Sequence, residues 1–130
     1  MKKSSVCLLI VLAWATQAFA AGVLDGKTFT GKIGDANKPP SQAQVDDFMF
    51  SEGRFKSTLC STFGYGSGAY TVTEEKGVVK FEAETASDSG GKMTWSGTVT
   101  GDRVQGTAKT VENGQTSESR FTGMLKTETQ

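Results

Sequence analysis

The chain of 130 residues contains no histidine, only two cysteines and only two prolines. Because it has no histidine, it lacks the commonest general base and metal ligand. This absence also excludes most serine and cysteine hydrolase mechanisms. Cys7 lies in an N-terminal apolar run, which leaves Cys60 as an odd cysteine. Two interpretations remain open for Cys60: a small, partly buried hydrophobic side chain, or an intermolecular disulfide or reactive thiol.

The sequence also has no excess of positive or negative charge. The sequence has 14 basic and 14 acidic residues, and loss of Lys2 and Lys3 would leave a net charge of about −2. This balance offers no basic footprint for nucleic acid and no cationic amphipathic helix for a membrane surface. We therefore expect neither a nucleic-acid partner nor a peripheral membrane anchor.

Residues 1–20 have the pattern of a secretory signal peptide. Lys2 and Lys3 precede the apolar run 6–14, and Ala18-Phe19-Ala20 matches a small-x-small cleavage site. The run is too short to span a bilayer, although an uncleaved anchor is the alternative. The sequence thus predicts a periplasmic or secreted single domain, residues 21–130, with no transmembrane segment.

The remainder alternates apolar and polar residues. The clearest stretch is 93–108, M-T-W-S-G-T-V-T-G-D-R-V-Q-G-T-A, which predicts two strands joined at Gly101-Asp102. No window shows a convincing helical period, so we predict an all-β protein: an eight-stranded antiparallel up-and-down meander barrel, with a two-sheet sandwich as the alternative. The other predicted strands are 27–33, 45–50, 54–60, 69–74, 78–85 and 118–126.

One face of these strands is aromatic and the other is polar. A membrane barrel would place its apolar residues outward, so we expect an apolar interior. An eight-stranded barrel is either filled by side chains or holds one small ligand. The candidates for lining the lumen are Phe48, Phe50, Phe55, Tyr70, Phe81 and Trp95.

Inward-facing glycines bear on that choice. A turn at Gly101-Asp102 pairs Gly97 with Gly106, and a turn centred on 114–115 would pair Gly106 with Gly123. Closure of the barrel could bring Gly31 to the same level, which would form a belt where strands bend. A loop at 113–114 would instead shift the last pairing by two residues and break the belt. The aromatics could fill this space or surround a cavity.

The connections predict two unlike ends. Turns near 52–53, 75–76 and 101–102 are minimal, whereas the connections 34–44, 61–68, 86–92 and 112–116 are longer and fall at the other end. This end is the predicted mouth, where binding residues concentrate. Phe63 and Tyr65 lie in one of its loops; they could gate a ligand, anchor a protein partner or plug the barrel.

Catalytic patterns are weak. Neighbours in a strand, such as Asp46 and Asp47, point to opposite faces and cannot act as a couple. The loop S-D-S-G-G at 87–91 lacks a histidine partner and the context of a nucleophile elbow. We expect the acidic residues to be solvated, and we predict no enzyme, no metal site and no cofactor.

The segments L-D-G-K-T-F-T-G at 24–31 and W-S-G-T-V-T-G-D at 95–102, within an eight-strand meander, resemble small secreted barrels of the lipocalin and avidin (calycin) kind. The resemblance implies a non-enzymatic protein that binds a small, largely apolar ligand in its lumen or mouth. Similar periplasmic barrels act as protease inhibitors, so the alternative is a protein-binding or inhibitor-like module that acts through its open-end loops. Fold alone does not decide between them.

Overall fold

The computed structural model describes residues 19–20 and 23–127, and these are strands almost throughout. A short strand β1 (Phe19–Ala20) precedes eight longer ones, and two short helical turns interrupt them: η1 (Pro40–Gln42) and α1 (Thr58–Ser61). The eight strands are β2 (Thr28–Asp35), β3 (Gln44–Ser51), β4 (Arg54–Ser57), β5 (Gly68–Glu75), β6 (Val78–Ala86), β7 (Lys92–Thr100), β8 (Arg103–Glu112) and β9 (Gln115–Leu125).

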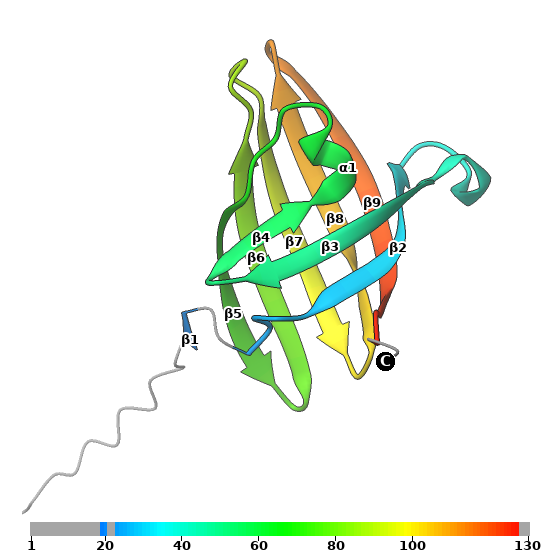
Figure 1. Cartoon of the computed structure of the whole chain (residues 1–130). Coiled ribbons are helices and arrows are strands. Elements are labelled where there is room, and N and C mark those ends of the chain that lie inside the picture. Colours follow the sequence, from blue (N-terminus) through cyan, green and yellow to red (C-terminus); the bar gives the residue numbers. More distant parts are fainter. Residues whose placement is uncertain (1–18, 21–22, 128–130) are drawn as a thin grey trace, which may run out of the picture.

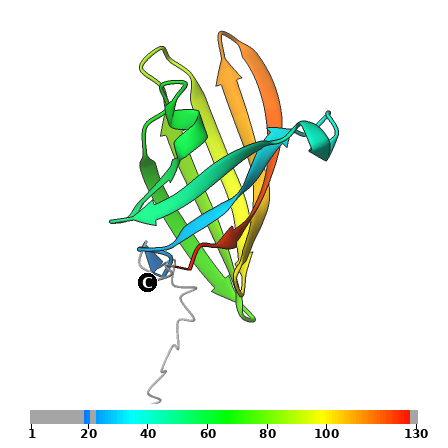
Figure 2. The same ribbon diagram turned by 45° about the vertical axis from the view of Figure 1, so that its right-hand side comes forward.

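The sheet closes on itself. Each strand from β2 to β9 pairs antiparallel with its neighbour in sequence, including β4 with β5 across α1 and the loop that separates them. Pairing of β9 with β2 completes the circle. The predicted eight-stranded meander barrel is confirmed, and the sandwich is wrong. In Figures 1 and 2 the long strands β5 to β9 form one wall, and β2 to β4 cross the opposite side at a steep angle.

The predicted signal peptide lies outside the described residues, apart from Phe19 and Ala20, which pair with Val72 and Thr71 of β5. Within the described part of the chain, no helix has the length and apolar character needed to cross a membrane.

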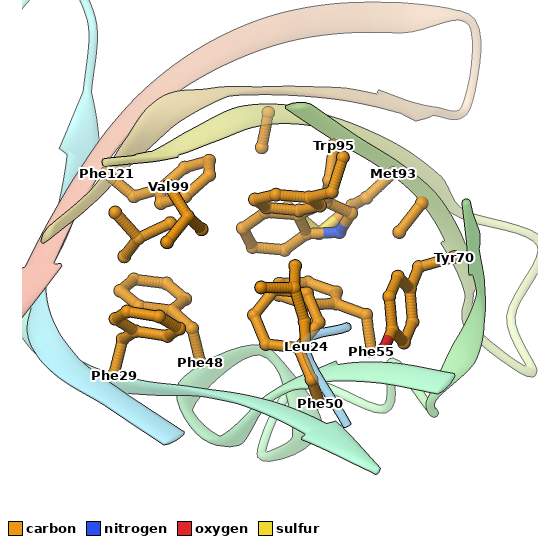
Figure 3. Close-up of a cluster of buried hydrophobic side chains, with 14 of the residues drawn as sticks. Leu24, Phe29, Phe48, Phe50, Phe55, Tyr70, Met93, Trp95, Val99 and Phe121 are labelled. Carbon is orange, nitrogen blue, oxygen red and sulfur yellow. The ribbon is translucent and has the colours of Figure 1, made fainter. Parts of the chain in front are cut away.

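Alternation sorts the side chains as predicted. The buried residues of each strand lie at its alternate, inward positions, and the core is dominated by aromatic rings (Figure 3). Trp95 is fully buried, and its indole Nε1 donates to Thr85 Oγ1 at 3.1 Å, so its polar atom is satisfied. Burial of an aromatic side chain of this size contributes about 3 kcal/mol, which fixes the register of β7.

Two predictions near β4 are wrong. The strand expected over 54–60 ends at Ser57, because the chain turns there into α1, a helix too short to show a period in the sequence. Asp46, expected to be solvated, is buried with 2% exposure. It lies on the inner face of β3 with Phe48 and Phe50, whereas Asp47 points outward and accepts a hydrogen bond from Thr30 Oγ1.

The β8–β9 connection is shorter than the predicted loop 112–116, and of the two turns that the sequence left open it adopts the one at 113–114. It is a two-residue turn at Asn113-Gly114, both with positive φ, like the turns at 52–53 and 76–77. Gly106 therefore faces Phe121, and Gly123 faces Val104. The four-glycine belt is broken into two pairs, Gly97 with Gly106 and Gly31 with Gly123.

The two ends of the barrel are unlike. At the end of the turns 52–53, 76–77 and 101–102, Leu24 is fully buried beneath the core, and Asp25 accepts hydrogen bonds from Tyr70 Oη at 2.6 Å and Gly53 N at 3.0 Å. This end is closed. At the opposite end lie α1 and the connections 36–43, 62–67 and 87–91 (Figure 1).

Candidate functional site

The six candidates for lining the lumen form the packed centre of the barrel. All are buried, and contacting ring pairs among them have centroids 4.8–6.3 Å apart. Figure 3 shows Trp95, Phe55 and Phe50 together in the interior, where Phe55 packs at tilted angles against both other rings. Of the two outcomes left open for the interior, the structure shows a middle filled by its own side chains.

A hollow of about 430 Å³ lies at the open end. We call it the mouth pocket. It lies between α1 and its following loop on one side and the ends of β2, β7, β8 and β9 on the other. Its lining comprises Ile33, Gly34, Asp35, Leu59, Cys60, Phe63, Tyr65, Met93, Thr110, Glu112 and Ser119.

The pocket changes character with depth because inner positions repeat every second residue. Along β8 the inner face runs from buried Ala108 through half-buried Thr110 to exposed Glu112. Along β2 it runs from buried Ile33 to exposed Asp35. The floor is therefore apolar, hydroxyl groups lie midway and carboxylates lie at the rim.

A buried aspartate holds α1 over one side of the pocket. Asp46 accepts hydrogen bonds from the Ser57 hydroxyl, from Thr58 Oγ1 at 3.1 Å and from Leu59 N at 2.9 Å. Ser57 caps the helix in turn, because its Oγ accepts from Cys60 N at 3.1 Å. These bonds fix the backbone that presents Leu59 and Cys60 to the pocket.

Cys60 is a free, half-buried thiol on the pocket wall. Burial raises its pKa above the ordinary thiol range; the Ser57 hydrogen bond opposes this, and the Asp46 charge adds to it. The thiol stays protonated at neutral pH, and the thiolate is the nucleophilic form. The structure thus supports the small hydrophobic role for Cys60 rather than a reactive one.

Tyr65 carries a polar atom without a partner. It is 6% exposed, and its hydroxyl makes no hydrogen bond among the described residues. The hydroxyl lies against Gly91, where a Cβ would overlap it and would also come within 2.9 Å of Glu112 Oε1. Burial raises the pKa of Tyr65, and the Glu112 carboxylate raises it further. Buried polar atoms normally have a hydrogen-bond partner, so the unpaired Tyr65 hydroxyl is the unusual feature of this site.

The two candidates from the mouth loop therefore differ. Tyr65 folds back into the barrel end, where its backbone bridges to Ser87, whereas Phe63 is 69% exposed on the rim. The prediction did not name the other lining residues as a site; those on inner strand positions are Ile33, Asp35, Met93, Thr110, Glu112 and Ser119. Their signal was available, because each continues the inner alternation of its strand to the mouth.

Two further hollows lie outside the barrel. One, of about 690 Å³, is a groove on the outer face of β5 to β9, where short hydroxyl side chains such as Ser96, Thr98 and Thr107 form the centre and Lys80, Glu82 and Arg120 the sides. The other, of about 250 Å³, lies beneath the connection 36–43. Among the described residues, no group of three histidine, cysteine or acidic residues is placed to hold a metal ion.

Fold and site together define a closed eight-stranded antiparallel β-barrel with a packed aromatic core, one sealed end and one open end with a pocket. No protein-family model, no curated protein and no solved structure matches this chain.

Proposed function

We propose that this protein is a non-enzymatic binding protein that takes one small, largely apolar ligand in the mouth pocket. The observation that carries the proposal is the unpaired Tyr65 hydroxyl in a pocket with an apolar floor. A volume of about 430 Å³ lies within the range of small-molecule sites. The likeness to lipocalin and avidin barrels supports the same function, although there the lumen holds the ligand and here aromatic rings fill it.

Ligand binding can be followed at two positions. Trp95, the single tryptophan after residue 20, lies one inner position below the pocket-lining Met93. Cys60 lines the pocket wall. We expect a bound ligand to change tryptophan fluorescence and to slow modification of Cys60 by a thiol reagent. Titration with fatty acids, amines and flavins is the first screen.

A matched pair of variants locates the site. Thr110→Phe places a ring in the pocket, whereas Thr107→Phe makes the same change on the outer face of the same strand. We expect Thr110→Phe to abolish binding and Thr107→Phe to leave it unchanged. Equal binding by both variants would place the ligand elsewhere.

A second function is favoured by Phe63 alone. An aromatic side chain 69% exposed on the rim is suited to anchoring a protein partner, as an inhibitor-like barrel requires. A protein that the native chain captures from periplasmic extract and that Phe63→Ala no longer captures would support this function. Retention of the partner would contradict it.

We also propose export through the N-terminal signal. The pattern of residues 1–20 supports it, and the test is N-terminal sequencing of the protein from expressing cells. We expect the mature chain to begin at Ala21.

A further inference from the structure

Charge at the open end is sorted by face. The mouth pocket is lined by two carboxylates, Asp35 and Glu112, and by no lysine or arginine among the described residues. The cations on the neighbouring strand ends occupy outward positions: Lys92, which pairs with Glu84 at 3.3 Å, and Lys109 and Arg120 on β8 and β9. A ligand in the pocket thus meets negative charge at the rim.

The unpaired hydroxyl lies beside one of these carboxylates. Tyr65 Oη and Glu112 Oε1 approach the same point above Gly91 from different loops and strands. A tyrosine hydroxyl donates one hydrogen bond and can also accept, whereas a carboxylate accepts only. An ammonium group supplies three donors and a positive charge, so it suits both groups at once.

The floor sets the rest of the ligand. Ile33, Leu59 and Met93 offer apolar surface beneath these polar groups. An inorganic cation would leave this apolar surface exposed to water. A fatty carboxylate would be repelled by the carboxylates of Asp35 and Glu112. A short alkyl chain that ends in an amine can contact both the apolar floor and the polar groups above it.

We infer that the mouth pocket selects small cationic amphiphiles, with the alkyl chain on Ile33, Leu59 and Met93 and the ammonium group at Glu112 and Tyr65. This inference rests on the proposed function and names its ligand class.

The test compares three probes that share a chain: octylammonium, octanol and octanoate, titrated by calorimetry at neutral pH. We expect octylammonium to bind about fivefold or more tightly than octanoate, with octanol between them. Tighter or equal binding of octanoate would overturn the inference and leave the proposed function standing. Binding of none of the three, with no protection of Cys60, would contradict both.

Glu112→Gln and Glu118→Gln form the matched pair for charge. Both residues are exposed at the same end, but Glu112 lines the pocket and Glu118 occupies an outward position of β9. We expect Glu112→Gln to reduce or abolish the preference for octylammonium over octanoate, and Glu118→Gln to preserve it. An equal effect of the two variants would show general surface attraction and overturn the inference.

Discussion

At the scale of single residues, the two tyrosines of the chain show what a hydroxyl gains from a partner. Tyr70 donates to Asp25 at 2.6 Å, whereas Tyr65 has no partner within the described chain. Both are buried. Removal of a paired buried hydroxyl costs stability, and removal of an unpaired one relieves a desolvation penalty.

Tyr65→Phe should therefore stabilise the unliganded protein by about 1 kcal/mol, because the buried hydroxyl lacks a partner to lose. Tyr70→Phe should instead lower stability by about 1 kcal/mol or more, through loss of its bond to Asp25. Urea denaturation of the two variants measures both signs. If Tyr65→Phe destabilises as much as Tyr70→Phe, the hydroxyl is satisfied in solution.

Gly97→Ala should destabilise the barrel by about 1–3 kcal/mol, because an inward Cβ would lie 2.6 Å from the ring of Phe81. Gly66→Ala is the control: its Cβ meets no atom within 4 Å, so stability should change by less than about 1 kcal/mol. Thermal unfolding compares the two. Equal effects would mean that the Phe81 ring moves aside at no cost.

At the scale of elements, alternation predicted most of what the structure shows. The inner and outer faces of all eight strands, the Gly97–Gly106 register and the closed end follow from residues a few positions apart. The Asn113-Gly114 turn could also be predicted from the sequence, because Asn-Gly is a strong signal for a two-residue hairpin. The sequence left a turn at 114–115 open as well, and the two turns place partners of Gly106 that differ by two residues; the structure pairs it with Phe121.

What alternation could not provide is the local geometry around α1. Four helical residues carry no period, and the burial of Asp46 depends on donors from Ser57, Thr58 and Leu59, more than ten residues along the chain. Parity alone places Asp46 inward. Only the tertiary structure shows that three hydrogen-bond donors stabilise the carboxylate at this buried position.

Asp46→Asn should loosen α1. The amide retains one carbonyl acceptor where the carboxylate offers two oxygens to three donors, so we expect a loss of about 1–3 kcal/mol in unfolding free energy. Because α1 presents Cys60, thiol modification in the native state should also accelerate. Asp47→Asn, on the outer face of the same strand, should change stability by less than about 0.5 kcal/mol and leave the labelling rate alone. Similar labelling in both variants would show that α1 is held by packing instead.

At the scale of the whole molecule, the barrel separates stability from binding. The aromatic core and the closed end, where Leu24 and the Tyr70–Asp25 bond seal the strands, hold the scaffold. The open end carries the unpaired hydroxyl, the free thiol and the inward carboxylates. The polar groups available to a ligand are thus gathered at the open end, apart from the residues that hold the scaffold.

Both tyrosines also couple this scaffold to alkaline pH. Burial raises the pKa of each, and a neighbouring carboxylate, Asp25 or Glu112, raises it further. The folded state therefore holds these protons more tightly than the unfolded chain, whose tyrosines titrate at about pH 10. Below that pH the contribution to stability is complete; above it the unfolded chain loses protons first, and stability falls as the pH rises toward the folded pKa values. Tyr65→Phe combined with Tyr70→Phe leaves the chain without tyrosine, so the fall above pH 10 should become shallower. An unchanged slope in urea denaturations across this range would show that the tyrosines do not cause the alkaline loss of stability.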